Sequence, residues 1–160
     1  LMHGYLSEML MGKMNGELIE EVNLPKKMAE TIISHGLNDY VKEVYASEEC
    51  VYSLKYKYAG TMDALISTQD NKLQICDFKQ KNSPAKREYS SIRNYFTQCI
   101  LYAIAHNEIH GTKIQSSVIL MCTPNLIFQK FEIEGQEFMD LQKEALERVE
   151  NYHRLISEST

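Results

Sequence analysis

The sequence lacks several features that would assign a protein to a broad class. It has no apolar run long enough to cross a membrane, no visible secretory signal, no internal repeat and no low-complexity segment. Its four cysteines, at positions 50, 76, 99 and 122, form no Cys-x-x-Cys pair, and most lie in apolar stretches. This pattern favours buried, reduced thiols over a zinc site or an iron–sulfur cluster. We therefore expect an intracellular protein in a reducing compartment.

An excess of positive charge is also missing, because 22 acidic residues outnumber 17 Lys and Arg and give a net charge of −5. That balance argues against general nucleic-acid affinity. The positive charge is nevertheless concentrated in one stretch with a single acid, Glu88. Its basic residues are Lys79, Lys81, Lys86, Arg87 and Arg93. A locally basic surface on an acidic protein is compatible with phosphate binding at one place.

The pattern of apolar residues predicts an alternation of helices and strands over 160 residues, a length sufficient for one domain with a core. Helices are expected at 3–13, from Pro25 to a stop at Gly36, at 88–107 and at 136–156. Strands are expected within 40–58 and at 58–67, 73–79, 114–122 and 126–133. This order predicts an α/β fold with a mixed central β-sheet flanked by helices.

A pair of charged residues closes the apolar strand at 73–79. Asp77 and Lys79 are costly to bury without partners, and the two-residue period of a strand directs both to the same face. A second carboxylate, Asp63, lies in the preceding strand. A turn at Asp70 and Asn71 makes the two strands an antiparallel hairpin, in which Asp63 and Asp77 come side by side.

Two adjacent carboxylates repel each other unless a cation joins them, and oxygen ligands favour Mg²⁺ or Mn²⁺. Such a metal polarises a phosphate oxygen and lowers the pKa of bound water, while Lys79 would orient that water and offset negative charge. The pattern thus indicates phosphodiester chemistry. The alternative is an ordinary cross-strand Asp–Lys pair at a sheet edge, and Asp-x-Lys alone does not decide between the two.

Further residues complete a longer motif. An acid at Glu48 or Glu49 precedes Gly60-Thr61-Met62-Asp63, then Asp77-Phe78-Lys79, then a helix with Gln98 and Tyr102 on one face. Over roughly 48–133 the sequence resembles the PD-(D/E)XK nuclease superfamily. It is most similar to the RecB-like exonuclease branch, which includes the mitochondrial genome maintenance exonucleases and phage relatives. Met62 stands where the superfamily name has proline, a position that contributes no ligand.

The resemblance implies a restriction-endonuclease-like fold with an αβββαβ core and one nuclease domain over 1–160, whether alone or as part of a longer protein. It implies roles for the following residues: Lys79, Asp63, Asp77, Glu48 and Gln98 as catalytic residues; Asp63, Asp77, the Phe78 carbonyl, His3 and Glu48 as ligands of Mg²⁺ or Mn²⁺; and Lys81, Lys86, Arg87, Tyr89, Arg93 and Tyr102 as nucleic-acid contacts. The other four histidines, at 35, 106, 110 and 153, lie at expected helix ends, where surface or capping roles are expected.

The function implied by the resemblance is a metal-dependent DNA exonuclease, a hydrolase acting on single-stranded or frayed ends in repair or recombination. An endonuclease of the same fold and a non-catalytic nucleic-acid-binding module are the alternatives. The second would be expected to lack an acid or the lysine, and Asp63, Asp77 and Lys79 are all present. The cytoplasm, a phage-infected host cell and an organelle matrix are equally compatible with the sequence.

Overall fold

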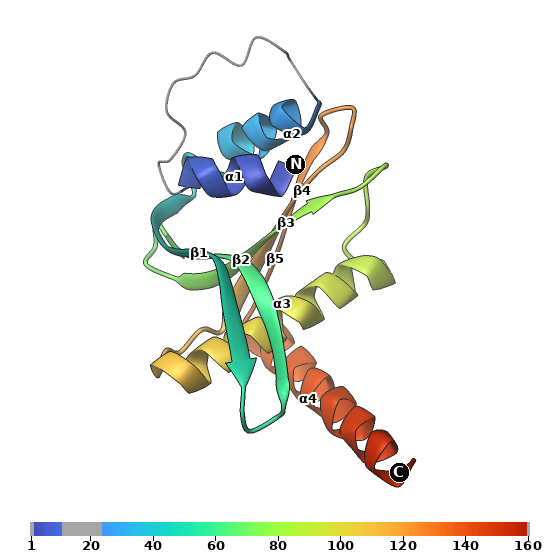
Figure 1. Cartoon of the computed structure of the whole chain (residues 1–160). Helices are drawn as coiled ribbons and strands as arrows, with labels where there is room; N and C mark the ends of the chain where they lie inside the picture. Colours follow the sequence, from blue (N-terminus) through green and yellow to red (C-terminus); the bar gives the residue numbers. More distant parts are fainter. Residues whose placement is uncertain (1, 11–23, 160) are drawn as a thin grey trace.

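A computed structural model describes residues 2–10 and 24–159 of the chain. Its helices are α1 (Met2–Leu10), α2 (Leu24–Ile32), the π-helical turn η1 (Ile33–Leu37), α3 (Ser90–His110) and α4 (Gly135–Glu158). Its strands are β1 (Val41–Ser53), β2 (Tyr58–Thr68), β3 (Leu73–Gln80), β4 (Ser116–Cys122) and β5 (Phe128–Glu134) (Figure 1). Among these described residues, no helix combines the length and apolar character needed to cross a membrane.

The five strands form one mixed sheet in the order β1-β2-β3-β4-β5. Only β3 and β4 are parallel, and α3 provides the crossover connection between them. The predicted mixed sheet flanked by helices is therefore confirmed, as is the αβββαβ order of elements. The predicted strand region at 40–58 is one long strand, β1, with register shifts near its start.

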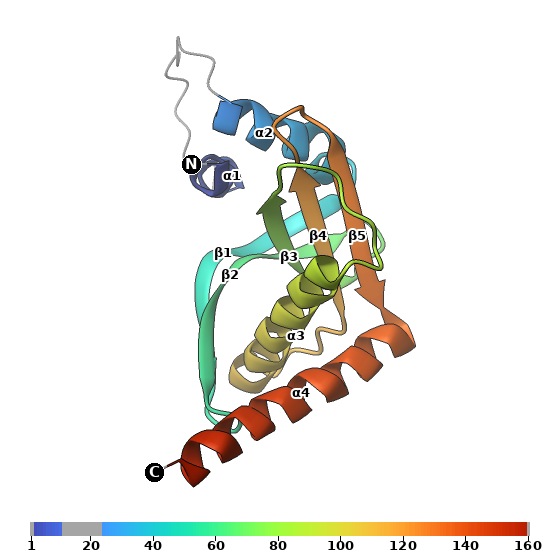
Figure 2. The ribbon, with the colours of Figure 1, turned by 90° about the vertical axis from the view of Figure 1, so that its right-hand side faces the viewer.

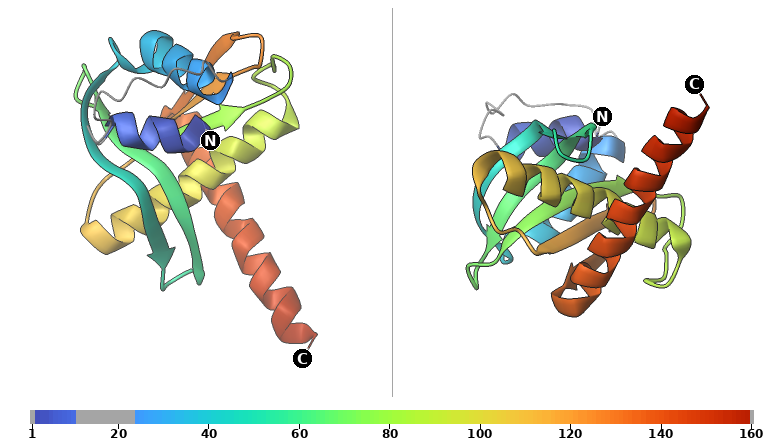
Figure 3. Two further views of the ribbon diagram at one scale, coloured as in Figure 1. Left: turned by 45° about the horizontal axis from the view of Figure 1, so that its top comes forward. Right: turned by 90° about the horizontal axis from the view of Figure 1, so that it is seen from below.

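The helices cover both faces of the sheet, with α1 and α2 on one side and α3 and α4 on the other (Figure 2). Strand β4 shows the reason, because all of its residues are buried and its side chains alternate between the two apolar cores. Val118 and Leu120 pack towards α1 and α2, whereas Ile119 and Met121 pack towards α3. In the view from below, α4 crosses α3 (Figure 3).

Two glycines have different roles at the ends of helices. Gly111 ends α3 with a left-handed φ of 68°, so the helix runs to His110 and past its expected end at 107. Gly36 was expected to stop the second helix, and this prediction is wrong, because η1 continues through it to Leu37. A side chain on Gly36 would approach Phe128 to 2.9 Å, so the glycine provides room for packing against β5. The expected end of the first helix near Gly12 lies outside the described residues.

Candidate active site

The candidate site forms where β2 separates from β3. The paired residues of this antiparallel ladder run from Ser67–Leu73 to Ala64–Cys76, and their register is the one expected from a turn at Asp70 and Asn71. Beyond Ala64–Cys76 a side chain continues the pairing, because Asp63 Oδ2 accepts a hydrogen bond of 2.8 Å from the Phe78 N–H. Asp63 is thus fixed against the backbone that carries Asp77 and Lys79.

Asp77 and Lys79 share one face of β3, as the strand period predicts, and Lys79 Nζ lies 3.1 Å from Asp77 Oδ2. The Asp77 side chain is almost fully buried. Burial raises the pKa of Asp77 to about 7, a hydrogen bond with Asp63 and its negative charge add to this, and Lys79 partly offsets it. Burial acts against the charge of Lys79 too, but Asp77 more than compensates and raises the lysine pKa. The two carboxylates therefore titrate as a coupled pair.

His3 extends from α1 to the same place. Its Nε2 lies 2.5 Å from the main-chain oxygen of Phe78 and 3.4 Å from Asp63 Oδ2. The hydrogen bond with Asp63 is the main cause of a raised His3 pKa, which burial partly opposes. Burial would raise the pKa of Asp63, yet hydrogen bonds from His3, Asp77 and the Phe78 N–H together lower it. The proton on His3 Nε2 consequently lies between Asp63 Oδ2 and the Phe78 carbonyl oxygen. A metal ion bound here would contact the same two oxygen atoms.

Glu48 lies across the β1–β2 ladder from Asp63. Its neighbours Ser47 and Glu49 pair with Ala64 and Met62, which flank Asp63, and Glu48 itself has a left-handed φ of 49°. A small hollow brings Glu48 together with Asp63 and four further residues, and its lining is His3, Ser7, Ser47, Glu48, Asp63 and Phe78. The structure thus places the expected additional acid next to the carboxylate pair.

Sequence reasoning missed two serines in this hollow. Ser7 Oγ lies 3.1 Å from Ser47 Oγ, and this hydrogen bond joins α1 to β1 beside the site. The spacing of Ser7 from His3 was an available signal, since residues four apart share one face of a helix. The pair helps to hold the His3 helix against the strand that carries Glu48.

Helix α3 supplies partners for the lysine from the other side of the sheet. Gln98 Oε1 accepts a hydrogen bond of 3.2 Å from Lys79 Nζ, and the ammonium also lies 4.7 Å from the centre of the Tyr95 ring. Tyr102, one helical turn after Gln98, packs against Gly60 at the start of the Gly-x-x-Asp strand. Burial, followed by the charge of Asp77, raises the pKa of Tyr102 to about 12, so its hydroxyl is neutral.

Gly60 gives a direct test of this packing, because a Cβ built there would lie 2.6 Å from Cε1 of Tyr102. We expect Gly60→Ala to lower the free energy of unfolding by about 1–3 kcal/mol, since the half-buried ring must move. Thermal unfolding would measure the loss, with Gly4→Ala as the matched control, since no atom lies within 4 Å of a Cβ there. Adding Tyr102→Leu should restore stability, and a Gly60→Ala protein as stable as Gly4→Ala would contradict the contact.

Not all of the basic residues between Lys79 and Arg93 lie at the candidate site. Arg87 and Arg93 form ion pairs with Glu137 and Glu144 of α4, and Glu137 and Arg87 shift each other's pKa towards the charged forms. Lys81 donates a hydrogen bond of 2.8 Å to Ser91 Oγ. Lys86 and Tyr89 are exposed in the segment just before α3. The nucleic-acid role of these residues remains a prediction.

The donor atoms of the site fit a hard divalent cation. Asp63, Asp77 and the Phe78 carbonyl have oxygen atoms that a metal ion would use as ligands, and His3 Nε2 lies at the same carbonyl. Asp77 Oδ2 is buried and receives no well-directed hydrogen bond from any described residue, although Lys79 is close. A buried carboxylate oxygen with an unused lone pair is what a metal ligand requires.

Comparison with solved structures supports the fold. No protein-family model matches the chain, and no curated protein matches it in sequence. The structure is similar to that of a proposed exonuclease from Eubacterium rectale, with a TM-score of 0.62 and 17% identity over 97% of this chain. The match spans 65% of the length of that protein.

A weaker similarity links the chain to the protein SSO0001, with a TM-score of 0.45, 16% identity and coverage of 75% of this chain and 53% of that one. Similarity at this level carries no functional argument. The first match does show that the mixed sheet flanked by helices also occurs in a proposed exonuclease, so this chain shares the α/β fold of that protein.

Proposed function

We propose that the chain is a metal-dependent DNA nuclease that acts as an exonuclease on single-stranded or frayed ends, and that residues 1–160 belong to one nuclease domain. The observation that carries the proposal is the meeting of Asp63, Asp77 and the Phe78 carbonyl beside Lys79, where β2 separates from β3. A half-buried lysine paired with a buried carboxylate that lies beside a second one is costly to maintain, and such groups gather at functional sites. The fold shared with the proposed exonuclease from Eubacterium rectale supports the same reading.

In this proposal Asp63, Asp77 and the Phe78 carbonyl hold Mg²⁺ or Mn²⁺, and His3 and Glu48 complete the site from α1 and β1. When bound, the metal polarises a phosphate oxygen and lowers the pKa of a coordinated water. The chain's own contribution is position, because hydrogen bonds fix Asp63 and His3 on the backbone of Phe78. These contacts set the ligand atoms in place before substrate arrives.

Lys79 is held by three neighbours in this proposal: Asp77, Gln98 and the Tyr95 ring. Its ammonium is thereby directed towards the place where β2 separates from β3. There it orients the attacking water and offsets charge on the phosphate in the transition state. Gln98 acts as a positioning residue, since its contact is with the lysine. Lys81, Lys86 and Tyr89 lie near the start of α3 and would contact the nucleic-acid strand beside the site.

The decisive experiment compares end-labelled linear DNA, single- and double-stranded, with closed circular single-stranded DNA. We expect linear DNA to be degraded with Mg²⁺ or Mn²⁺, the circle to stay intact, and EDTA to stop the reaction. Asp63→Asn is the matched control, because an amide oxygen can still accept from the Phe78 N–H while the charge is lost. Cleavage of the circle would identify an endonuclease, and equal cleavage by Asp63→Asn would disprove the site.

A further inference from the structure

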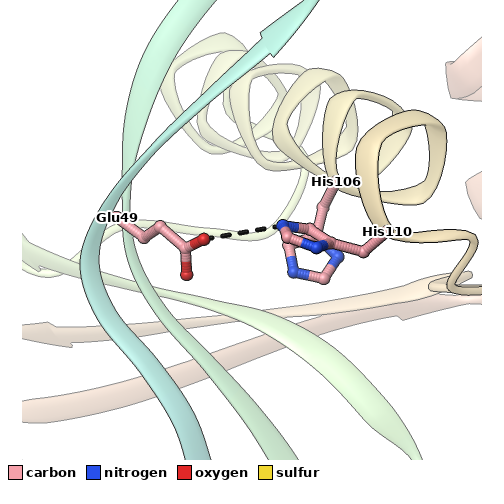
Figure 4. Close-up of side chains that lie close together, drawn as sticks. All are labelled: Glu49, His106 and His110. Atoms are coloured by element: carbon pink, nitrogen blue, oxygen red, sulfur yellow. Dashed lines mark ion pairs between the residues drawn. The ribbon is translucent and has the colours of Figure 1, made fainter.

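A second group of metal-ligating side chains lies apart from the nuclease site. Glu49 of β1 and His106 and His110 of α3 face one another, and their ligand atoms all lie within 4.8 Å of one another (Figure 4). His110 Nε2 is 3.6 Å from Glu49 Oε1, and the two imidazole rings are 4.4 Å apart between centres. Of the described side chains, these three form the one group of three or more His, Cys, Asp or Glu residues that meets this spacing.

The spacing of the histidines explains why both reach the same point. His106 and His110 are four residues apart in α3, so they lie on one face of the helix. From its place near an expected helix end, His106 was predicted to have a surface or capping role. That expectation is wrong for His106, because α3 continues to His110 and the imidazole of His106 is buried against β1.

A chain of hydrogen bonds fixes which nitrogen of His106 is free. Asn107 Oδ1 accepts from the Ile114 N–H at 2.8 Å, and its Nδ2 donates to the Ile114 carbonyl at 3.1 Å, so the amide orientation is determined. Thr112 must then donate its hydroxyl proton to Asn107 Oδ1. The same hydroxyl, 2.8 Å from His106 Nδ1, can only accept there, so His106 carries its proton on Nδ1.

With the proton on Nδ1, the lone pair of the neutral imidazole is on Nε2. A hydrogen bond from the second nitrogen to a fixed acceptor is the arrangement that orients metal-binding histidines. Burial, followed by the neighbouring His110, lowers the pKa of His106, which agrees with a neutral ring. The three residues also line one surface hollow of about 550 Å³, so a cation there has space for a further ligand such as water.

We propose that Glu49, His106 and His110 bind a transition-metal cation of the zinc class, which ties β1 to the C-terminal end of α3. Two imidazoles and one carboxylate are typical ligands of Zn²⁺, whereas Mg²⁺ prefers oxygen alone. Metal–ligand bonds of about 2.0–2.2 Å in a tetrahedron separate neighbouring ligand atoms by about 3.3–3.6 Å. The His110–Glu49 distance already lies near that value, and both side chains are partly exposed and free to adjust.

This site is distinct from the proposed nuclease site, although both involve β1. Glu48 lines the hollow beside Asp63, whereas the next residue, Glu49, meets the histidines of α3. An ion pair between a protonated His110 and Glu49 would explain that one contact. It would not account for the buried His106, whose proton the Thr112 and Asn107 hydrogen bonds hold on Nδ1, which leaves the lone pair of Nε2 available to a metal.

The test measures metal binding in a protein whose nuclease site is disabled by Asp77→Asn. After chelation and dialysis, calorimetry with Zn²⁺ and visible spectroscopy with Co²⁺ should give one bound ion per chain and the intense d–d bands of a low-coordinate site. Adding His110→Ala or Glu49→Gln should weaken Zn²⁺ binding more than ten-fold. Thr112→Val, which removes the acceptor for His106, should weaken it about ten-fold.

His153→Ala is the matched control, because this histidine forms a hydrogen bond with the Lys57 carbonyl and is not part of the proposed site. Its removal should leave Zn²⁺ affinity unchanged. Circular dichroism would verify that each variant is folded, which is expected since Glu49 and His110 are partly exposed. Unchanged affinity in both His110→Ala and Glu49→Gln, or no Zn²⁺ binding by the Asp77→Asn protein, would overturn the proposal. The readout is bound metal, so the result is independent of whether the chain cleaves DNA.

Discussion

Asp77→Asn is expected to abolish metal-dependent cleavage and, at the same time, to stabilise the metal-free protein at neutral pH. Asp77 is 3% exposed, and burial beside Asp63 raises its pKa to about 7. Its ionised form is therefore disfavoured by the fold, and an uncharged amide of the same shape removes that cost. We expect a gain of about 2 kcal/mol in the free energy of unfolding, or roughly 5 °C in Tm.

The pH dependence follows from the direction of the shift. In the unfolded chain the carboxyl has its ordinary pKa of 3.8, so between about pH 4 and pH 7 the folded protein retains a proton that the unfolded chain has released. The contribution of Asp77 to stability is present below pH 4 and is lost as pH rises to 7. The advantage of Asp77→Asn should accordingly grow over this range and stay constant above it.

Thermal unfolding from pH 4 to pH 9 in EDTA would measure this difference, and the same series with Mg²⁺ or Mn²⁺ would complete the test. Metal should raise the Tm of the wild-type protein and have little effect on Asp77→Asn, because a ligand is lost. Asp140→Asn on the exposed face of α4 is the matched control and should change stability by less than about 0.5 kcal/mol. A destabilised Asp77→Asn protein would show that the carboxylate is a structural ion-pair partner of Lys79.

Lys79→Ala is expected to lower the cleavage rate by about 10²–10³-fold, the loss usual for one charge-stabilising group in an active site. The lysine contacts Asp77, Gln98 and Tyr95, none of which can replace its ammonium. Because Lys79 is not a metal ligand, the rise in Tm with Mg²⁺ or Mn²⁺ should persist. Single-turnover cleavage of labelled linear DNA would measure the rate.

Lys81→Ala separates this specific role from general attraction to phosphate. Lys81 lies two residues further along and donates to Ser91 Oγ, so its loss should weaken binding and affect cleavage only a few-fold. Gln98→Ala should give an intermediate loss of about ten-fold, since the amide positions the lysine. Equal losses in Lys79→Ala and Lys81→Ala would mean that both lysines act by attracting DNA.

Much of the site could be predicted from local patterns. The turn at Asp70 and Asn71 sets the register of the β2–β3 hairpin, and Asn71 adopts the left-handed φ of 63° that asparagine tolerates. The two-residue period of β3 then places Asp77 and Lys79 on one face. His3 was found through the resemblance of its segment to a known motif, and the structure brings it to Asp63 and the Phe78 carbonyl.

Other features depend on contacts between distant segments and had no local signal. Gly36 reads as a helix stop, yet it lies within a helical turn where a side chain would approach Phe128 of β5. Arg87 and Arg93 read as a basic surface, yet Glu137 and Glu144 of α4 pair with them. A run of charged residues is visible in the sequence of one segment. Whether its charges are neutralised depends on which other element packs beside that segment.

The sequence by itself determined the order of elements, the hairpin register and the acids and lysine at its open end, because turn chemistry and side-chain periodicity are local properties of the chain. The tertiary structure alone decided where β2 leaves β3, how α1 brings His3 into that split and how α3 brings its histidines to Glu49. These outcomes depend on packing helices onto both faces of a sheet, which joins residues far apart in the chain. The resemblance therefore pointed to the carboxylates and lysine of the proposed nuclease site, and only the folded chain brings Glu49, His106 and His110 together.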